Sequence, residues 1–321
     1  MNDKSPFFSI IIPTYNRERS IARAIESILC QTFIDFEIII IDDASKDNTQ
    51  TVISSFLDDR IIYSRNNENK ERCISRNIGI NSSRGQYICF LDSDDYHLPN
   101  HLEEIYGDIK KRNYPKAFFF TNAFNESADG DRTDRLCPDF ESFDPFTYFL
   151  RYTVNPQRWA VHKDIFINNL FDPEITICED MDTSLRIVSS AIPIFQIKKS
   201  TTVYVAALDS FTVSDQMKSE KELFYLRKIF LKKELKNNLP KVETNRLLSM
   251  CFFHLAIKAL AEKNRLKFYT LALKSFIYYP KGYNGKTNKI LLVNSIYRLP
   301  FIGFIVRKMI NFKKNERISI Q

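Results

Sequence analysis

The sequence predicts an α/β protein with a mostly parallel, twisted sheet flanked by helices, followed by a basic α-helical region. Short apolar runs alternate with segments of helical spacing over the first two-thirds of the chain, a pattern typical of βαβ units. The charge balance then changes sign. Residues 1–215 hold 23 Lys and Arg against 33 Asp and Glu, a balance of −10, whereas residues 216–321 hold 23 against 6, a balance of +17. We therefore expect two domains, 1–215 and 216–321.

The predicted strands are the short apolar runs in the first domain. They lie at 7–12, 36–41, 61–63, 87–91 and 117–121. Between them, apolar residues at helical spacing predict helices over 17–31, 49–57, 72–82 and 100–111. The stretch 125–139 is polar and acidic and contains Gly130, so we expect a surface loop there.

The apolar run 87–91 ends at three carboxylates, Asp92, Asp94 and Asp95. Ligand sites of open α/β sheets lie beyond the carboxyl ends of such strands. Like charges this close disfavour one another, so a cation would stabilise the cluster. Mg²⁺ and Mn²⁺ prefer carboxylate oxygens and often keep phosphates as further ligands. The cluster therefore predicts a metal–diphosphate site, with a solvated acidic turn as the alternative.

Polar residues also follow the first two predicted strands, at Asn16 and at Asp42 and Asp43. The carboxyl ends of parallel strands meet at one edge of a sheet, which is where a nucleotide would bind. Three such coincidences favour the ligand site over the acidic turn.

Four segments carry a resemblance to a known family. They read Ser9-Ile-Ile-Ile-Pro-Thr-Tyr-Asn16, Ile41-Asp-Asp-Ala-Ser-Lys-Asp-Asn-Thr49, Ser75-Arg-Asn-Ile-Gly79 and Phe90-Leu-Asp-Ser-Asp-Asp95. In order and spacing they resemble the family 2 glycosyltransferases of GT-A fold, over about the first 215 residues. The resemblance implies an inverting enzyme that uses a nucleotide-diphosphate sugar, most often a UDP-sugar, with Mg²⁺ or Mn²⁺ as cofactor.

The resemblance also assigns residues to the donor. They are Pro13, Thr14, Tyr15, Asn16, Asp42, Asp43, Arg76, Asp92 and Ser93. Tyr15 would stack on the base, Asp42 would accept a hydrogen bond from the uracil ring, and Asp94 would bind the metal. Arg76 would lie near the base and ribose, and Asp92 would face the ribose. Simpler interpretations are core packing for Tyr15, a helix cap for Asp42 and a surface charge for Arg76.

Glu179 and Asp180 open a predicted helix and match the family's acidic pair, whose second member is the general base. Inverting transfer needs one carboxylate that takes the acceptor hydroxyl proton as that oxygen attacks the anomeric carbon. We expect Asp180 in this role, with Glu179 beside it. Carboxylates in the first turn of a helix also complement its dipole, which is the interpretation we give to Asp182.

On the acceptor side we expect Asp95 and Trp159, the latter as an aromatic platform for a carbohydrate. The alternative for Trp159 is a half-buried core position. After the strand-like run 202–205, many relatives carry a histidine that helps bind metal or diphosphate. This chain has none between Ala206 and Thr212, where Asp209 or Ser210 could replace it. The missing histidine motivates an alternative function, a non-catalytic nucleotide-sugar-binding subunit of a glycan-assembly complex.

The basic region predicts helices over 222–236, 243–262 and 266–279. Further on, the apolar stretch 299–306 is flanked by Lys and Arg, which suits a helix at an anionic membrane surface. The alternative is a helical cap on the first domain. Recognised nucleic-acid motifs are missing, so no nucleic-acid partner is expected.

Localisation is predicted from two features. The chain has neither a signal-peptide pattern nor an apolar stretch of the roughly 18–20 residues that span a bilayer. Its six cysteines form no CxxC pair, which favours reduced thiols. We expect a cytoplasmic enzyme, peripheral on the cytoplasmic face of the inner membrane, that extends a lipid-linked or cell-surface glycan.

Overall fold

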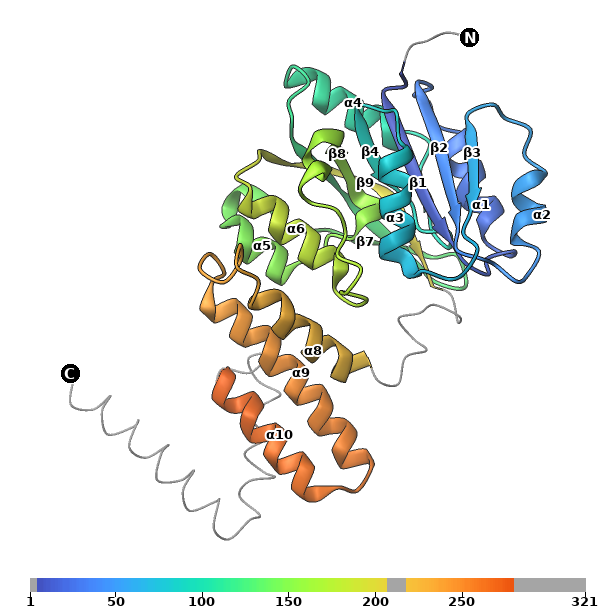
Figure 1. The fold of residues 1–321 in the computed structure, drawn as a ribbon. Coiled ribbons are helices and arrows are strands. Elements are labelled where there is room, and N and C mark those ends of the chain that lie inside the picture. Colours follow the sequence, from blue (N-terminus) through green and yellow to red (C-terminus); the bar gives the residue numbers. More distant parts are fainter. Residues whose placement is uncertain (1–4, 207–217, 280–321) are drawn as a thin grey trace. The chain divides into compact units, whose positions relative to one another are not determined.

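The structure, a computed structural model, describes residues 5–206 and 218–279, which fall into two compact units (Figure 1). The first unit takes in the chain up to residue 215 together with 229–238, and the second takes in 216–228 and the chain from 239 onward. Residues 229–238, which we expected in the basic region, thus belong to the first unit. The domain boundary at 215 otherwise stays a prediction.

A mixed sheet of nine strands lies at the centre of the described part of the first unit, which confirms the α/β class. The strands are β1 (Phe8–Thr14), β2 (Phe36–Asp42), β3 (Ile61–Arg65), β4 (Tyr87–Phe90), β5 (Tyr96–His97), β6 (Phe118–Glu126), β7 (Arg132–Arg135), β8 (Trp159–His162) and β9 (Ile194–Val205). Their order is β3-β2-β1-β4-β8-β6-β9-β5, and β7 pairs with β6.

Strand direction divides the sheet into two halves. In the first half, β1 pairs in parallel with β2 and β4, and β2 pairs in parallel with β3. In the second half, β8 runs antiparallel to both β4 and β6, while β6 and β9 are parallel. The parallel half brings the carboxyl ends of β1, β2 and β4 to one edge, as the sequence predicted.

The region 125–139 differs from the predicted loop, because part of it forms a hairpin. Strand β6 continues to Glu126 and pairs antiparallel with β7. Arg132 Nε donates to Glu126 Oε2 at 2.8 Å, and the Arg132 guanidinium lies 5.5 Å from the centre of the Tyr96 ring. These cross-strand contacts stabilise strands whose polar composition indicated a loop.

The described part of the first unit also contains six α-helices. They are α1 (Ile21–Leu29), α2 (Thr49–Ser54), α3 (Glu71–Ser82), α4 (His101–Lys111), α5 (Pro145–Arg151) and α6 (Glu179–Ser189). Helix α3 packs close against β1, since a Cβ on Gly79 would lie only 2.5 Å from Ile11 Cγ2. Only glycine allows this approach, which places α3 against the middle of β1.

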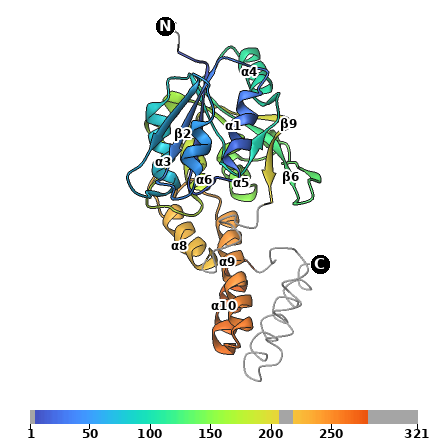
Figure 2. The same cartoon turned by 90° about the vertical axis from the view of Figure 1, so that its right-hand side faces the viewer.

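The second unit is helical, as predicted. It contains most of α8 (Lys218–Phe230), together with α9 (Lys241–Ala261) and α10 (Arg265–Tyr278). Helices α9 and α10 run side by side (Figure 1) and overlap in the turned view (Figure 2), with Ala256, Ala259 and Ala272 buried among their contacts. The Ser249 and Ser275 hydroxyls meet at 3.0 Å across this interface. The predicted apolar stretch 299–306 lies outside the described residues.

None of the helices in residues 5–206 and 218–279 is both long enough and apolar enough to cross a bilayer.

Candidate active site

The loops that follow β1 and β2 are joined to each other at the predicted donor edge. The Asn16 backbone N–H donates to Ser45 Oγ at 2.9 Å, and Asn16 Oδ1 accepts from the Lys46 backbone N–H at 2.8 Å. Of the preceding residues, Pro13 is half-buried and Thr14 buried, whereas the Tyr15 side chain is 38% exposed. Tyr15 therefore offers an aromatic ring to a ligand at this edge.

Asp42 and Asp43 stabilise this edge of the sheet through hydrogen bonds to neighbouring segments. Asp42 is wholly buried, and its two oxygens accept from the Ser45 backbone N–H at 2.8 Å and from the Tyr63 hydroxyl at 2.9 Å. Burial, and then the Asp42 carboxylate, raises the pKa of Tyr63, so this phenol remains a donor. The wholly buried Asp42 side chain presents no exposed oxygen to a base, so its contact with the uracil ring stays a prediction.

Asp43 organises the chain after β3. Its Oδ1 accepts from Asn66 Nδ2 at 2.7 Å and from the Lys70 backbone N–H at 2.9 Å, one residue before α3 begins. Asp43 thereby links the end of β2 to the start of the helix that carries Arg76.

Arg76 lies at the centre of the site. Its guanidinium is 2% exposed and donates to Asp92 Oδ1 at 2.9 Å through one terminal nitrogen and to Glu179 Oε1 at 3.0 Å through the other. Burial disfavours the charge, but the two carboxylates outweigh this effect and raise the pKa of Arg76 above its usual value. One buried cation thus joins the end of β4 to the start of α6, and it is not the surface charge of the alternative interpretation.

The acidic pair lies where α6 begins. Asp180 is partly exposed, and its Oδ1 accepts from the Met181 backbone N–H at 2.8 Å. Burial, followed by the charge of Glu179, raises the pKa of Asp180 to about 6, although Arg76 and Arg72 partly oppose this shift. A carboxylate with such a pKa is ionised at neutral pH and is a stronger base than an ordinary aspartate.

The turn after β4 carries the predicted metal ligand. The Asp94 side chain is partly exposed, its Oδ2 lies 3.5 Å from Arg17 Nη2, and its backbone oxygen accepts from Arg23 Nη2. Asp92 is also partly exposed, and Ser93 is buried. Residues 5–206 and 218–279 contain no cluster of three or more metal-ligating side chains. Two accessible carboxylates fit a Mg²⁺ or Mn²⁺ ion that takes most of its ligands from phosphate oxygens and water.

The placement of Trp159 contradicts its predicted role as a platform. Its ring is wholly buried and lies nearly parallel to the Phe171 ring, with 6.0 Å between the two ring centres. Its Nε1 donates to the Val154 carbonyl at 2.7 Å. Strand β8 is paired on both edges, with β4 and β6, and its residues Trp159, Ala160 and Val161 are all buried. Trp159 is therefore a core residue in this structure.

Asp95 is 6% exposed and binds protein groups with both oxygens. Oδ1 accepts from the Val205 backbone N–H at 2.9 Å and Oδ2 from Gln157 Nε2 at 2.8 Å. Burial and then the charges of Asp94 and Asp92 raise the pKa of Asp95 to about 8. Its role in acceptor binding stays a prediction, and its contacts instead fasten the turn after β4 to the end of β9.

Several residues of the site were not predicted from the sequence, among them Tyr63, Asn66 and Arg72. Tyr63 and Asn66 bind the two aspartates after β2, and Arg72 Nη1 lies 3.5 Å from Glu179 Oε1. Arg72 precedes Arg76 by one helical turn, so the two share a face of α3. That spacing was the one signal in the sequence that could have revealed Arg72.

Comparisons with known proteins agree with this geometry. Residues 9–166 match the family model described as Glycosyl transferase family 2. Over 119 residues the chain is 40% identical to the UDP-Glc:alpha-D-GlcNAc-diphosphoundecaprenol beta-1,3-glucosyltransferase WfaP of Escherichia coli, a match that covers 37% of this chain and 46% of that protein. The match thus spans about half the length of this relative.

Two solved structures share the fold. The crystal structure of S. aureus TarS 1–349 in complex with UDP-GlcNAc superposes with a TM-score of 0.65 at 19% identity, covering 86% of this chain and 82% of that one. The mannosyltransferase PcManGT from Pyrobaculum calidifontis, in complex with GDP-Man and Mn²⁺, gives a TM-score of 0.54 at 14% identity and covers 89% of each chain.

The curled α/β sheet and these superpositions show the GT-A fold. The match over residues 9–166 identifies a glycosyltransferase family 2 domain in this chain, as the four sequence segments indicated.

Proposed function

We propose that the protein is an inverting glycosyltransferase that moves a sugar from a UDP-sugar to a hydroxyl group of a lipid-linked glycan, with Mg²⁺ or Mn²⁺. One observation carries the proposal: Arg76 binds both Asp92 and Glu179, so the donor end of the site and the acidic pair form one network. The UDP-GlcNAc in the TarS complex supports the donor class, and the donor and acceptor in the name of WfaP support both substrate classes.

In this mechanism the acceptor oxygen attacks the anomeric carbon from the face opposite the diphosphate. The bond from that carbon to the β-phosphate oxygen breaks, UDP leaves with the electron pair, and the configuration inverts. Asp180 takes the hydroxyl proton, and its raised pKa suits this task. Asp94 and Asp92 would hold the cation, which when bound neutralises charge on the leaving diphosphate. Tyr15 would stack on the uracil, and Arg76 would keep Asp92 oriented.

The first test is UDP release by the purified protein with Mn²⁺ and a panel of UDP-sugars, with and without a diphosphate-linked lipid acceptor. We expect release with one donor, abolished by EDTA and reduced at least about 100-fold in Asp94→Ala, because both remove charge stabilisation of the leaving group. Asp59→Ala is the matched control, since Asp59 is an exposed aspartate two residues before β3 and outside the site. UDP binding without turnover under every condition would contradict the enzyme and favour the non-catalytic subunit.

That second candidate rests on the missing histidine after β9. The residues that could replace it, Asp209 and Ser210, lie outside the described residues. Both candidates predict UDP binding, so only turnover distinguishes them.

We further propose that the second unit associates with an anionic membrane surface, where a lipid-linked acceptor would be found. Helix α10 exposes Leu266 (80%), Leu273 (39%) and Ile277 (66%), whose spacing of seven and four residues places them on one helical face. Exposed Lys267 and Lys274 accompany them, and α10 contains no acidic residue. An apolar stripe beside basic residues is typical of helices that lie in the membrane interface.

Flotation with vesicles tests this association. We expect the full chain to float with vesicles of phosphatidylglycerol and phosphatidylcholine at low salt, and to be released at 0.5 M NaCl as the charges are screened. Leu266→Asp/Ile277→Asp should prevent flotation while UDP release from a soluble acceptor is retained. Flotation that is equally strong with pure phosphatidylcholine would contradict the electrostatic contribution.

A further inference from the structure

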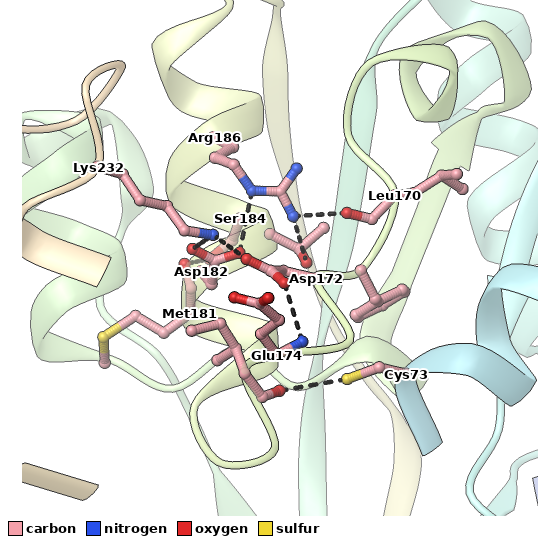
Figure 3. A network of polar contacts seen from close by, with 12 residues as sticks. Cys73, Leu170, Asp172, Glu174, Met181, Asp182, Ser184, Arg186 and Lys232 are labelled. Atoms are coloured by element: carbon pink, nitrogen blue, oxygen red, sulfur yellow. Dashed lines mark hydrogen bonds and ion pairs between the residues drawn. The ribbon is translucent and has the colours of Figure 1, made fainter. Parts of the chain in front are cut away.

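Asp182 lies on the side of α6 away from the proposed base. Successive helix residues are about 100° apart, so Asp182 stands about 200° from Asp180. Its side chain is wholly buried, with Oδ2 3.0 Å from Arg186 Nε and Oδ1 2.7 Å from Lys232 Nζ (Figure 3). We expected Asp182 only to complement the helix dipole, which requires neither burial nor an ion pair. The structure adds two cationic partners.

Lys232 connects α6 to the loop that precedes it. It comes from the segment 229–238, and its Nζ lies 2.8 Å from Asp172 Oδ2 as well as 2.7 Å from Asp182 (Figure 3). Asp172 is at the start of the loop 170–178, which leads into the acidic pair. The Lys232 ammonium group therefore connects the loop that precedes Asp180 to the helix α6 that carries it.

Two further contacts hold the same end of the loop. Arg186 Nη2 donates to the Leu170 carbonyl at 2.6 Å, and Asp172 Oδ1 accepts from the Glu174 backbone N–H at 2.9 Å. The network in Figure 3 thus fixes the first turn of the loop against α6.

Helix α3 holds the loop from its other side. Asn77 exchanges two hydrogen bonds with the Phe171 backbone, at 2.8 and 2.9 Å, and the Cys73 thiol donates to the Ile175 carbonyl at 3.3 Å. The loop ends at Cys178, whose φ of 64° lies in the left-handed region that side chains other than glycine disfavour. Such a conformation persists where the surrounding contacts impose it.

We propose that Lys232 is a positioning residue for sugar transfer, since by joining Asp172 to Asp182 it fixes the loop 170–178 against α6 and so orients the Asp180 carboxylate. The proposal rests on the proposed function, in which Asp180 is the base. It assigns a role in the reaction to a residue beyond the region matched by the family model.

The two anchors of the loop have different consequences for the donor. Helix α3 also carries Arg76, which binds Asp92 on the donor side. The carboxylates that Lys232 binds, Asp172 and Asp182, belong to the loop and to the far side of α6. Removing Lys232 should therefore displace the base and leave the UDP site intact. Displacing a reacting group by about 1 Å can cost a factor of about 100 in rate.

The test compares Lys232→Met with Lys233→Met, a matched control on the neighbouring exposed lysine, and with Lys232→Arg, which keeps the charge. Activity is normalised to the concentration of UDP-binding sites, so that unfolded protein does not count. For Lys232→Met we expect kcat to fall about 10- to 100-fold with the Kd of UDP within twofold. Without this cation the negative charges of Asp172 and Asp182 are no longer balanced, so they should raise the pKa of Asp180 and move the acid limb of the pH profile to higher pH. Lys232→Arg should recover most of kcat, and Lys233→Met should resemble the wild type.

Hydrogen exchange gives a readout that does not depend on turnover. In Lys232→Met, amides of 170–180 should exchange at least about tenfold faster while those of 87–95 remain unchanged. A wild-type protein without turnover would contradict the proposed function. Hydrogen exchange would still test whether Lys232 holds the loop 170–178 against α6. Any of three results for Lys232→Met would overturn the positioning role. They are wild-type exchange rates at 170–180, an unchanged kcat, and an equal loss of kcat and of UDP affinity.

Discussion

Replacing Asp180 by asparagine is expected to lower kcat about 100- to 10,000-fold, the range that general base catalysis contributes, because an amide cannot take the acceptor proton. The Kd of UDP should stay within about twofold, since Asp92 and Arg76 are retained. UDP release with saturating donor and acceptor measures the first quantity, and calorimetric titration with UDP measures the second. A variant that keeps more than a tenth of wild-type kcat would show that another group takes the proton.

The pH dependence follows from the same carboxylate. The pKa of Asp180 is raised to about 6, and only its ionised form is a base. The kcat/KM for the acceptor should therefore be constant above about pH 7 and fall tenfold per pH unit well below pH 6. Glu179→Gln removes the neighbouring negative charge, so it should move this limb to lower pH. A flat profile from pH 5 to 8 would contradict the assignment.

Stability should change in the opposite direction from activity in Asp180→Asn. A carboxyl group whose pKa is higher in the folded than in the unfolded state destabilises the fold once it ionises. The penalty therefore grows between the usual aspartate pKa of 3.8 and about pH 6, and it persists above that pH. We expect the asparagine variant to be more stable by about 1–3 kcal/mol at pH 7.5 and indistinguishable near pH 3.5. Urea unfolding at both pH values measures this difference, and added stability would exclude misfolding as the cause of lost activity.

The sequence predicted the first half of the sheet better than the second for a physical reason. Strands β1, β2 and β4 are parallel and covered on both faces, so they are continuous apolar runs that contrast with their neighbours. Strand β7 has no apolar residue, and its pairing with β6 depends on cross-strand partners that only the fold brings together. Single-sequence periodicity cannot indicate such a hairpin.

The same difference separates the predicted from the missed residues of the site. Asp42, Asp43 and Asp92 follow apolar strands, so their positions at the sheet edge could be predicted. Their partners Tyr63 and Arg76 approach from elsewhere in the chain, and only Arg76 lay in a family segment. The direction of a side chain was equally hidden, because the polar neighbours of Trp159 gave no sign that β8 is a central strand.

Arg76→Gln should be the most destabilising change in the site, with a loss of about 3–5 kcal/mol in the free energy of unfolding. Arg76 is 2% exposed, and its removal leaves the nearly buried Glu179 carboxylate without its closest cation. Arg72→Gln is the matched control: Arg72 is on the same helix and contacts the same Glu179 oxygen, but at 3.5 Å and with 34% exposure. That exposed contact should contribute less than about 1 kcal/mol. Urea unfolding at pH 7.5 compares the two variants.

The cause of that loss can be separated from lost packing by removing the partner charge as well. If the cost arises from an unpaired buried carboxylate, then Arg76→Gln/Glu179→Gln should be more stable than Arg76→Gln alone, since the second substitution removes the stranded charge. If the guanidinium instead stabilises the fold through its contact with the Phe171 ring, at 5.2 Å, the two losses should add. Recovery in the double variant would show that α3 and α6 are held together by charge, and that the acidic pair is kept in place by the same cation that orients Asp92.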